Sequence, residues 1–374
     1  MTLQSITIGS LVHWHMYDDA VYPYAISSTG VIKGSKMADN IAMFFPTSKT
    51  FTVVYTGKYR LSALGGGGSG GAIFTTTTGG AASGGAGGAF CEKEVDLLAG
   101  DELILVVGLP GAGVSSTVSG TGVAGNAGTE SSIHGTSINM HAPGGTEGLY
   151  TTVDTTTIVG GTCNIATGGT INYAGGSGGS AKHYTNGAES GGGGASGSPF
   201  GTGGSGGYSI AVGAIIASGG GGAVGEFIGG NVSVTSTLGG GAGTGSSASG
   251  STPGVNRFGI YGPSSVDGFA RNLSSTASTG IVFSFDSSVD PFRGLTGGCG
   301  AETGGSGAGG TGTYGTVGFS GGVCGGGGGV ASASAVTSGG SPLGGGSGGA
   351  TSTLTGPATS ANGGPGIVVI ERIG

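Results

Sequence analysis

Two histidines near the start of the chain have the residue type and the spacing of metal ligands. His13 and His15 are separated by Trp14, so on an extended strand both imidazoles lie on the same face. In a threefold assembly, three such pairs could surround one iron ion on the axis with six imidazole nitrogens. The simpler interpretation, which we favour, is that both are surface or interface residues beside Trp14. We therefore expect no bound metal, with His13 and His15 as the weaker, metal-binding alternative.

Catalytic chemistry is not indicated by the sequence. No serine lies in a nucleophile elbow, and no pair of carboxylates stands beside a plausible acid or base. The stretch 108–115 has the glycine spacing of a phosphate-binding loop, but Val114 stands where such a loop needs its lysine. The densest acidic group is predicted to be the solvated face of a hairpin: Glu92, Glu94, Asp96, Asp101 and Glu102. We expect neither an enzyme nor a cofactor.

The cysteines follow no metal-binding spacing. Four are present, and none forms a Cys-x-x-Cys pair: Cys91, Cys163, Cys299 and Cys324. The interpretation we favour is four small buried thiols. Cys299 and Cys324 both lie within glycine-rich runs and could meet if adjacent runs pack together. A disulfide between them, formed after release from the cell, is the alternative.

Glycine dominates the elements that must hold these side chains. Of the 374 residues, 97 are glycine, and many stand in contiguous runs such as 65–68, 191–194 and 325–329. Because glycine loses the most backbone entropy on folding, such a chain is either disordered or folded by a device that needs the missing side chain. A content of 36% hydrophobic and only 8% charged residues favours a packed fold.

Packed polyproline II helices are the backbone structure that best accommodates these glycine runs. Collagen is excluded, because the glycines are contiguous and only 11 prolines are present. A polyproline II helix has three residues per turn and no internal hydrogen bonds, so its backbone must bond to neighbouring chains that approach closely. The predicted fold is therefore mainly β, with β-sandwich strands flanking a glycine-rich slab of packed polyproline II helices.

Strand patterns lie at the two ends of the glycine-rich region. Residues 50–56 are rich in Thr, Val, Phe and Tyr, and after a predicted turn at Gly57-Lys58 the segment 59–63 alternates apolar and polar residues. The stretches 90–98 and 103–107 are predicted to form a hairpin around the turn 99–101. The apolar run 367–370 is predicted to be an interior strand that pairs with this opening region.

The organisation is read as an N-terminal attachment module, 1–45, and a glycine-rich domain, 46–374. The domain includes an inserted Ser/Thr-rich region, about 114–172, which carries His134, Asn139, Met140, His141 and Tyr150. Glycine blocks then alternate with short segments without a regular period. If the chain runs back and forth through these blocks, the connecting loops emerge at the ends of the slab as a scaffold for variable tips.

Charge and hydropathy exclude several partners. The net charge is −7 and no basic patch is present, so nucleic acid is not an expected partner. No apolar run is long enough to span a membrane. The first ten residues lack the features of a signal peptide, so we expect the chain to fold in the cytoplasm of the cell that makes it.

Several stretches resemble a known family. The run 59–71, Tyr-Arg-Leu-Ser-Ala-Leu-Gly-Gly-Gly-Gly-Ser-Gly-Gly, resembles the opening of a glycine-rich domain of bacteriophage tail fibres. The stretches 87–90 and 105–108 and the ending 363–371 are similar to the same domain. The later blocks resemble the tip adhesins of T-even-like phages, in which polyproline II glycine helices form a sandwich whose distal loops bind the bacterial receptor. The N-terminal module is shorter than theirs, and 114–172 looks unlike theirs.

The resemblance implies a virion protein of a phage tail or tail fibre, made in the host cytoplasm. Its partners would be a bacterial outer-membrane protein or surface polysaccharide and, through 1–45, other tail or fibre proteins, with a homotrimer as one possible state. The candidate receptor contacts are loop residues: His183, Tyr184, Asn186, Arg257, Phe258, Tyr261, Phe269, Arg271, Tyr314 and Phe319. The alternatives are a structural tail component without a receptor role and, less favoured, an ice-binding polyproline II protein.

Overall fold

The computed structural model describes residues 2–8, 11–17, 41–76, 79–184, 187–199, 201–209, 215–221, 313–314, 317–318, 320–321, 324–341 and 343–373. These residues form strands and extended segments, and no helix occurs among them. The prediction of a mainly β fold is confirmed. Near the N-terminus, β1 (Thr2–Ile8) pairs antiparallel with β2 (Leu11–Tyr17).

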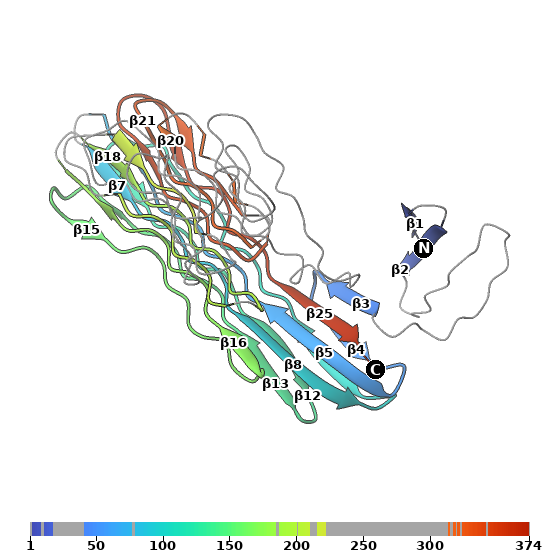
Figure 1. Cartoon of the computed structure of the whole chain (residues 1–374). Helices are drawn as coiled ribbons and strands as arrows, with labels where there is room; N and C mark the ends of the chain where they lie inside the picture. The colour runs from blue at the N-terminus through green and yellow to red at the C-terminus, as the bar shows by residue number, and fades with distance from the viewer. Residues whose placement is uncertain are drawn as a thin grey trace, which may run out of the picture.

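Two antiparallel sheets form the end of the molecule that carries the C-terminus, called the base below (Figure 1). The first sheet has the order β16 (Ile171–Tyr173), β8 (Phe90–Leu97), β5 (Gly57–Leu64), β25 (Ile367–Arg372) and β3 (Ile41–Phe45). The second has the order β13 (Ile138–Ala142), β12 (Ser131–Gly135), β9 (Glu102–Val106) and β4 (Lys49–Thr52).

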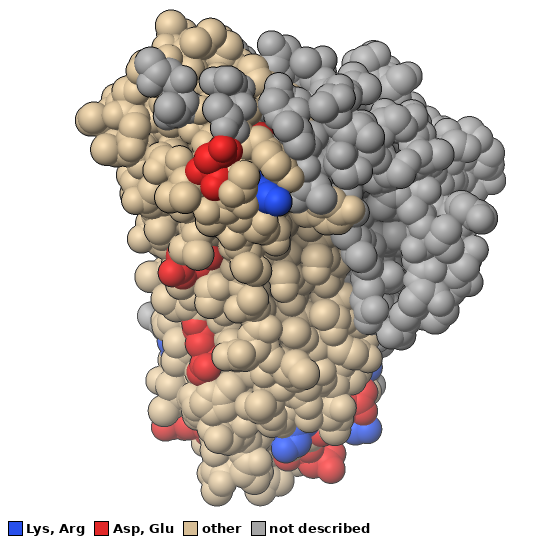
Figure 2. All heavy atoms as spheres, turned by 90° about the vertical axis from the view of Figure 1, so that its left-hand side faces the viewer, with Lys and Arg blue, Asp and Glu red and all other residues tan. Residues whose placement is uncertain are grey.

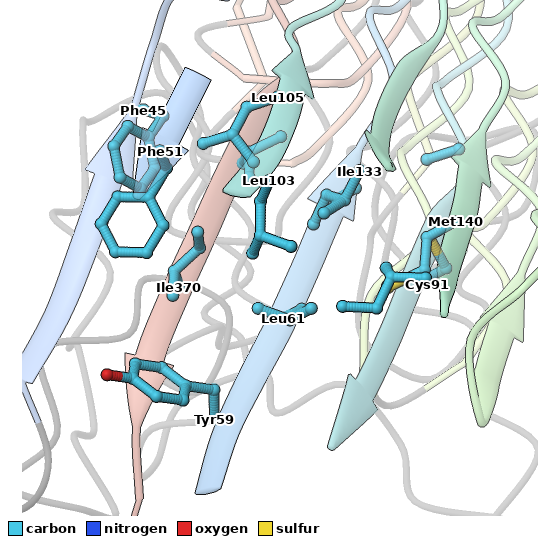
Figure 3. Close-up of a cluster of buried hydrophobic side chains, with 14 of the residues drawn as sticks. Phe45, Phe51, Tyr59, Leu61, Cys91, Leu103, Leu105, Ile133, Met140 and Ile370 are labelled. Atoms are coloured by element: carbon cyan, nitrogen blue, oxygen red, sulfur yellow. The ribbon is translucent and has the colours of Figure 1, made fainter. Parts of the chain in front are cut away.

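The main hydrophobic core lies between these two sheets (Figure 3). The apolar half of the predicted alternation in β5 is confirmed, because Tyr59, Leu61 and Ala63 are all buried in this core. The predicted exposure of the other face is wrong at Ser62, which is 1% exposed. Leu103 and Leu105 enter it from β9 of the second sheet, at about 1% exposure each. Two sheets with alternating apolar residues thus pack face to face, as in a β-sandwich.

The C-terminal strand is interior, as predicted. β25 pairs with β5 on one side and with β3 on the other, and Val368, Val369 and Ile370 are buried. The predicted turn at Gly57-Lys58 is wrong, because both residues belong to β5. The residues 41–45, which were expected to belong to the attachment module, form the edge strand of this sheet.

The predicted hairpin of 90–98 with 103–107 is wrong. Both strands form, but β8 pairs with β5 and β16, whereas β9 pairs with β12 and β4. The turn at 98–101 therefore crosses from one sheet to the other instead of joining partners. Cys91 and Leu97 of β8 and Leu103 and Leu105 of β9 nevertheless pack in one core, which they enter from opposite sides.

The acidic group is only partly a solvated face. Glu92 is 4% exposed and accepts a hydrogen bond from the Ser62 hydroxyl, so its predicted exposure is wrong. Arg60 on β5 lies between the acids of the neighbouring strands, with its nitrogens 2.6 Å from Glu371, 3.1 Å from Glu94 and 3.6 Å from Glu92. Cross-strand pairing with Arg60 thus compensates the buried carboxylates.

Extended glycine-rich segments run from the base towards the opposite end (Figure 1). Segment 83–89 donates to its neighbours in strict rotation: Ser83, Ala86 and Ala89 bond to 143–149, Gly84 and Gly87 to 174–180, and Gly85 and Gly88 to 343–349. Its carbonyls accept from 65–71, 159–165 and 191–197. The segment is therefore surrounded, and its donors turn to a new neighbour at each residue with a period of three.

Glycine is required in these segments by close approach. A Cβ built on Gly87 would overlap the backbone of Ala195, and one built on Gly68 would overlap the carbonyl of Thr146. Neither glycine is in the left-handed region; of the runs quoted in the sequence analysis, none shows a positive φ at a described glycine. The absence of a side chain, not conformational freedom, is what allows the backbones to bond across so short a gap.

Short strands continue the segments at the end opposite the base, called the loop end below. One sheet has the order β11 (Thr121–Val123), β6 (Ala72–Phe74), β23 (Ala350–Ser352), β21 (Val330–Ser332) and β20 (Thr313–Tyr314), and another has β14 (Tyr150–Thr151), β7 (Gly80–Ala82), β18 (Ala188–Ser190) and β19 (Ile215–Ala217). The smaller sheets are β10 (Ser115–Ser116), β24 (Ala358–Thr359) and β22 (Val336–Thr337), and the pair β15 (Thr157–Ile158) and β17 (Ala181–Lys182).

Parallel pairing at the loop end follows from the direction of the segments. β6, β21 and β23 each end a segment that leaves the base, and they pair in parallel. β7, β18 and β19 each begin a segment that returns, and they also pair in parallel. Residues 114–172, which looked distinct in sequence, supply the segments 124–130, 143–149 and 159–165 of the same packing.

Candidate functional site at the loop end

The described loops between outgoing and returning segments gather at the loop end, away from the C-terminus (Figure 1). They are 117–120, 152–156, 333–335 and 353–357, with 75–76 and 183–184 as the described parts of two more. Surface loops held by a rigid scaffold are where binding residues are most often found. This end is therefore the candidate functional site.

Ionisable side chains from three loop-end elements meet at one side of this site. Lys182 ends β17, and its Nζ lies 4.9 Å from the centre of the Tyr184 ring. The next residue, His183, turns inward; its backbone N–H donates to Thr156 at 3.0 Å and its Nδ1 lies 3.8 Å from Glu189 Oε2. Asp154, on the loop 152–156, acts electrostatically on both His183 and Glu189.

Glu189 is a buried carboxyl group in the middle of β18. Its side chain is fully buried, and neither carboxylate oxygen has a hydrogen-bond partner within the described part of the chain. Burial raises the pKa of Glu189 to about 9, because removal from water penalises the charged form. Burial also lowers the pKa of His183. Near neutral pH both groups are therefore uncharged. The buried pair beside β18 then carries no net charge.

The loop 152–156 contains a residue in a rare backbone conformation. Thr155 has a φ of 58°, which is unfavourable for a β-branched side chain. Its backbone N–H donates to Asp154 Oδ1 at 3.0 Å. Such strain persists only where the surroundings impose it, and it is found often at binding sites. The neighbouring Val153 is 63% exposed.

Several large apolar side chains near the loop end are exposed. The exposed ones here are Val118, Val123, Leu149, Tyr150 and Val153. The Tyr150 ring lies directly against Gly122 of β11, where a Cβ would overlap it. Exposed aromatic and aliphatic side chains, where they form a contiguous patch, are typical of a protein-interaction surface.

This surface was missed from the sequence, although a signal was present. Within the outer segments, large side chains recur at every third position and are exposed: Val123, Asn126 and Thr129; Thr146 and Leu149; Val159, Thr162 and Ile165. In these segments every third residue faces outward, and glycines that contact the interior lie between these outward positions. The pattern was hidden because those stretches contain no long glycine run.

The predicted contact residues fall into three groups. His183 is only 2% exposed, so it supports the loop from inside and offers no surface for a receptor in this conformation. Tyr184 is half-buried beside Lys182, and Tyr314 lies on β20. The others lie outside the described residues: Asn186, Arg257, Phe258, Tyr261, Phe269, Arg271 and Phe319.

The histidine and cysteine predictions are tested only in part. His13 and His15 lie on β2, opposite Ile6 and Gln4. Cys91 is a buried thiol, as predicted, and burial raises its pKa to about 12. Cys163 is half-buried, with a pKa raised by burial to about 11. Cys324 is buried beside Leu64 and Phe90, and its proposed partner Cys299 lies outside the described residues.

Charged side chains are sparse over the face in Figure 2 and gather at its lower end, the base. No three His, Cys, Asp or Glu side chains converge as metal ligands in the described ranges. Nor do those ranges contain a helix that is long and apolar enough to cross a membrane.

Comparison with protein-family models finds no match, and neither does comparison with curated proteins.

Proposed function

We propose that this chain is a virion tail fibre or fibre-tip protein that binds a bacterial surface receptor through loops at the end of a rigid polyglycine scaffold. The observation that carries the proposal is the separation of the two ends: the sandwich and the C-terminus at the base, and the connecting loops at the other end. The resemblance of 59–71 and 363–371 to glycine-rich tail-fibre domains supports the same reading. The protein acts by adhesion and not as an enzyme.

The scaffold, in this proposal, is a bundle of polyproline II helices. The three-residue rotation of the hydrogen bonds from 83–89 supports this assignment, because a polyproline II helix has three residues per turn. The glycines whose added Cβ would overlap a neighbouring carbonyl support it too. Each segment forms backbone hydrogen bonds to other segments of the same chain on several sides, so the bundle has little freedom to deform.

Rigidity is what makes the loop end suitable for adhesion. A surface that is already ordered loses less conformational entropy on binding. Several copies on one virion then raise the effective concentration at the cell surface, so that weak contacts add up to firm attachment. The exposed apolar residues beside Tyr150, together with Lys182 and Tyr184, are the described part of this contact surface.

Binding of the purified, fluorescently labelled chain to a panel of candidate bacterial strains tests the proposal. We expect binding to some strains, and a loss of at least tenfold in affinity when Val153→Asp and Tyr150→Ala are combined. The matched control is Ile104→Asp, a change at a 55% exposed aliphatic residue on the base. Binding that is lost equally in the control variant, or that no strain displays, would favour a structural component of the tail.

A further inference from the structure

One buried pair of ionisable side chains at the loop end lacks the partners that would stabilise a charge. Glu189 lies in the middle of β18, between β7 and β19, and its side chain is fully buried. His183 faces it, with Nδ1 3.8 Å from Glu189 Oε2. In the described part of the chain, this nitrogen and both carboxyl oxygens have no hydrogen-bond partner. Buried polar atoms without partners are rare in folded proteins, so the pair requires an explanation.

The charged groups around the pair do not favour an ionised Glu189. Asp154, on the loop 152–156, acts on both members of the pair, and its negative charge favours the protonated form of each. The Lys182 ammonium group lies against the Tyr184 ring, and Tyr208 precedes the residue to which Lys182 N–H donates. The strands packed against β18 contribute no titratable side chain: β7, β19, β21 and β23. The Glu189 carboxyl group is therefore buried as a neutral acid.

Two backbone hydrogen bonds fix the chain beside the pair. The His183 N–H donates to Thr156 O at 3.0 Å, and the Gly187 N–H donates to Tyr184 O at 2.8 Å. The Tyr184 backbone also acts on the Glu189 carboxyl group. These two bonds therefore hold the backbone that separates the carboxyl group from solvent.

We propose that His183 and Glu189 form a pH-sensitive latch, which holds Lys182 and Tyr184 in their present arrangement at neutral pH and releases them as the pH rises. In the closed state the carboxyl group keeps its proton, because no cation compensates its charge. In the open state the two backbone bonds are broken, His183 leaves its buried position and water solvates the ionised carboxylate. Opening therefore releases one proton to solvent, and alkaline conditions favour it.

The sign of the pH dependence follows from both members of the pair. In the open state, Glu189 and His183 have their ordinary pKa values of 4.5 and 6.5. In the closed state, burial raises the pKa of Glu189 to about 9 and lowers the pKa of His183. Between pH 6.5 and 9, only Glu189 changes its protonation on opening, so the open fraction rises about tenfold per pH unit. Just below pH 6.5, opening also adds a proton to His183, and the two changes cancel.

The consequence for adhesion rests on the proposed function. If Lys182 and Tyr184 belong to the receptor-contact surface, receptor binding weakens as the latch opens. The latch itself is measured without a receptor. Failure of the latch and failure of the adhesion proposal are therefore separate results.

Amide hydrogen exchange of the full-length chain, resolved by residue and corrected for the pH dependence of the chemical exchange step, tests the latch. We expect the protection of the His183 and Gly187 amides to fall about 30-fold between pH 7 and 8.5. Because the opening is local, a low concentration of urea should leave exchange at these two amides unchanged. It should accelerate exchange at the Gly87 amide, which bonds to Gly176 O inside the glycine segments.

Two variants separate the members of the pair. In Glu189→Gln the ionising group is absent, so the protection of both amides should stay constant between pH 7 and 8.5. It should instead fall below pH 6.5, where only His183 takes up a proton on opening. In His183→Gln, protection should fall about tenfold per pH unit from pH 5 to 8.5. The matched control is Glu130→Gln, which removes an exposed carboxylate 2.7 Å from His141 and should behave as the wild type.

Constant protection of the two amides in the wild type between pH 7 and 8.5 would overturn the proposal. So would an undiminished loss of protection in Glu189→Gln over the same range. Exchange at both amides that urea accelerates as strongly as exchange at Gly87 would mean that only global unfolding responds to pH, and would overturn it as well. If either variant folds poorly, the pH and urea dependence of the wild type decides the outcome.

Discussion

Single buried ionisable residues set the pH dependence that this protein should display. Glu189 has a folded-state pKa of about 9, above its ordinary value of 4.5. Between these values the unfolded chain has released the proton while the folded chain still holds it, so stability falls as pH rises. The contribution is fully present below pH 4.5 and is lost as pH approaches 9. The lowered pKa of His183 acts in the opposite direction, below its ordinary value of 6.5.

Glu189→Gln should therefore stabilise the chain at alkaline pH. Glutamine has the same shape and no charge to bury, so the variant should lose the decline in stability with pH, which for one proton is about 1.4 kcal/mol per pH unit. Chemical denaturation between pH 7 and 8.5 measures this with little interference from His183. Parallel stability curves for the two proteins would mean that Glu189 is not held as a buried acid.

Arg60 is predicted to matter more than its neighbour Lys58. Glu92 and Glu371 are both buried, and Arg60→Ala removes the cation that compensates them, which should cost about 3 kcal/mol in the free energy of unfolding. Lys58 pairs with Glu94 at 2.7 Å but is solvent-exposed, so Lys58→Ala should change stability little. Equal effects in urea denaturation would mean that the buried acids are neutralised in another way.

At the scale of elements, the apolar pattern was a better guide than the connections. The alternation of 59–63 correctly indicated a strand with Tyr59, Leu61 and Ala63 on a buried face, because that pattern is a local property of the sequence. It did not indicate that Ser62 on the other face is buried too, since its cover comes from distant residues. The pairing of 90–98 with 103–107 was predicted from their short separation, but whether a turn stays in one sheet or crosses to the other depends on where both strands find apolar partners. Glu92 is buried for the same reason, since its cover comes from residues far away in the chain.

The candidate site was predicted least well. His183 lies between Lys182 and Tyr184, in a stretch that looks like a solvated loop, yet it packs inward against Glu189. The apolar residues around Tyr150 escaped notice because their three-residue spacing has meaning only once the glycine segments are known to bond on several sides. The overall alternation of glycine blocks and loops could be read from composition, but not which segments become neighbours.

Glycine at the interior positions should be almost irreplaceable. Gly87→Ala places a methyl group on the backbone of Ala195 and Ser196, which cannot move without breaking bonds to other segments. We expect a loss of more than 3 kcal/mol, above the usual range for overpacking. Gly100→Ala is the comparison, because it has a φ of +96° but open space around it, and it should lose only about 1 kcal/mol. Similar midpoints of thermal unfolding for both variants would show that close approach does not require glycine here.

On the scale of the whole molecule, strands of the base continue directly into the glycine segments. β5 runs directly into 65–71, 83–89 runs directly into β8, and 360–366 runs directly into β25. Some interior segments also bond to segments more than 200 residues away, as Gly85 and Gly88 do to Ser347 and Gly344. A local opening of one segment would break bonds to several others at once. The arrangement therefore favours one cooperative unit over a base and a body of glycine segments that unfold separately.

Ile370→Ala tests this cooperativity from the base. Ile370 is fully buried between the sheets, and its truncation should cost about 3 kcal/mol. If the base and the glycine segments open together, amides of 83–89 should exchange with deuterium about 100-fold faster in the variant, although they lie outside the truncated core. Leu354→Ala, at a 58% exposed residue of the loop end, should leave the exchange unchanged. Faster exchange confined to the strands of the base would instead identify the glycine segments as an independently stable body, held together by their own backbone hydrogen bonds.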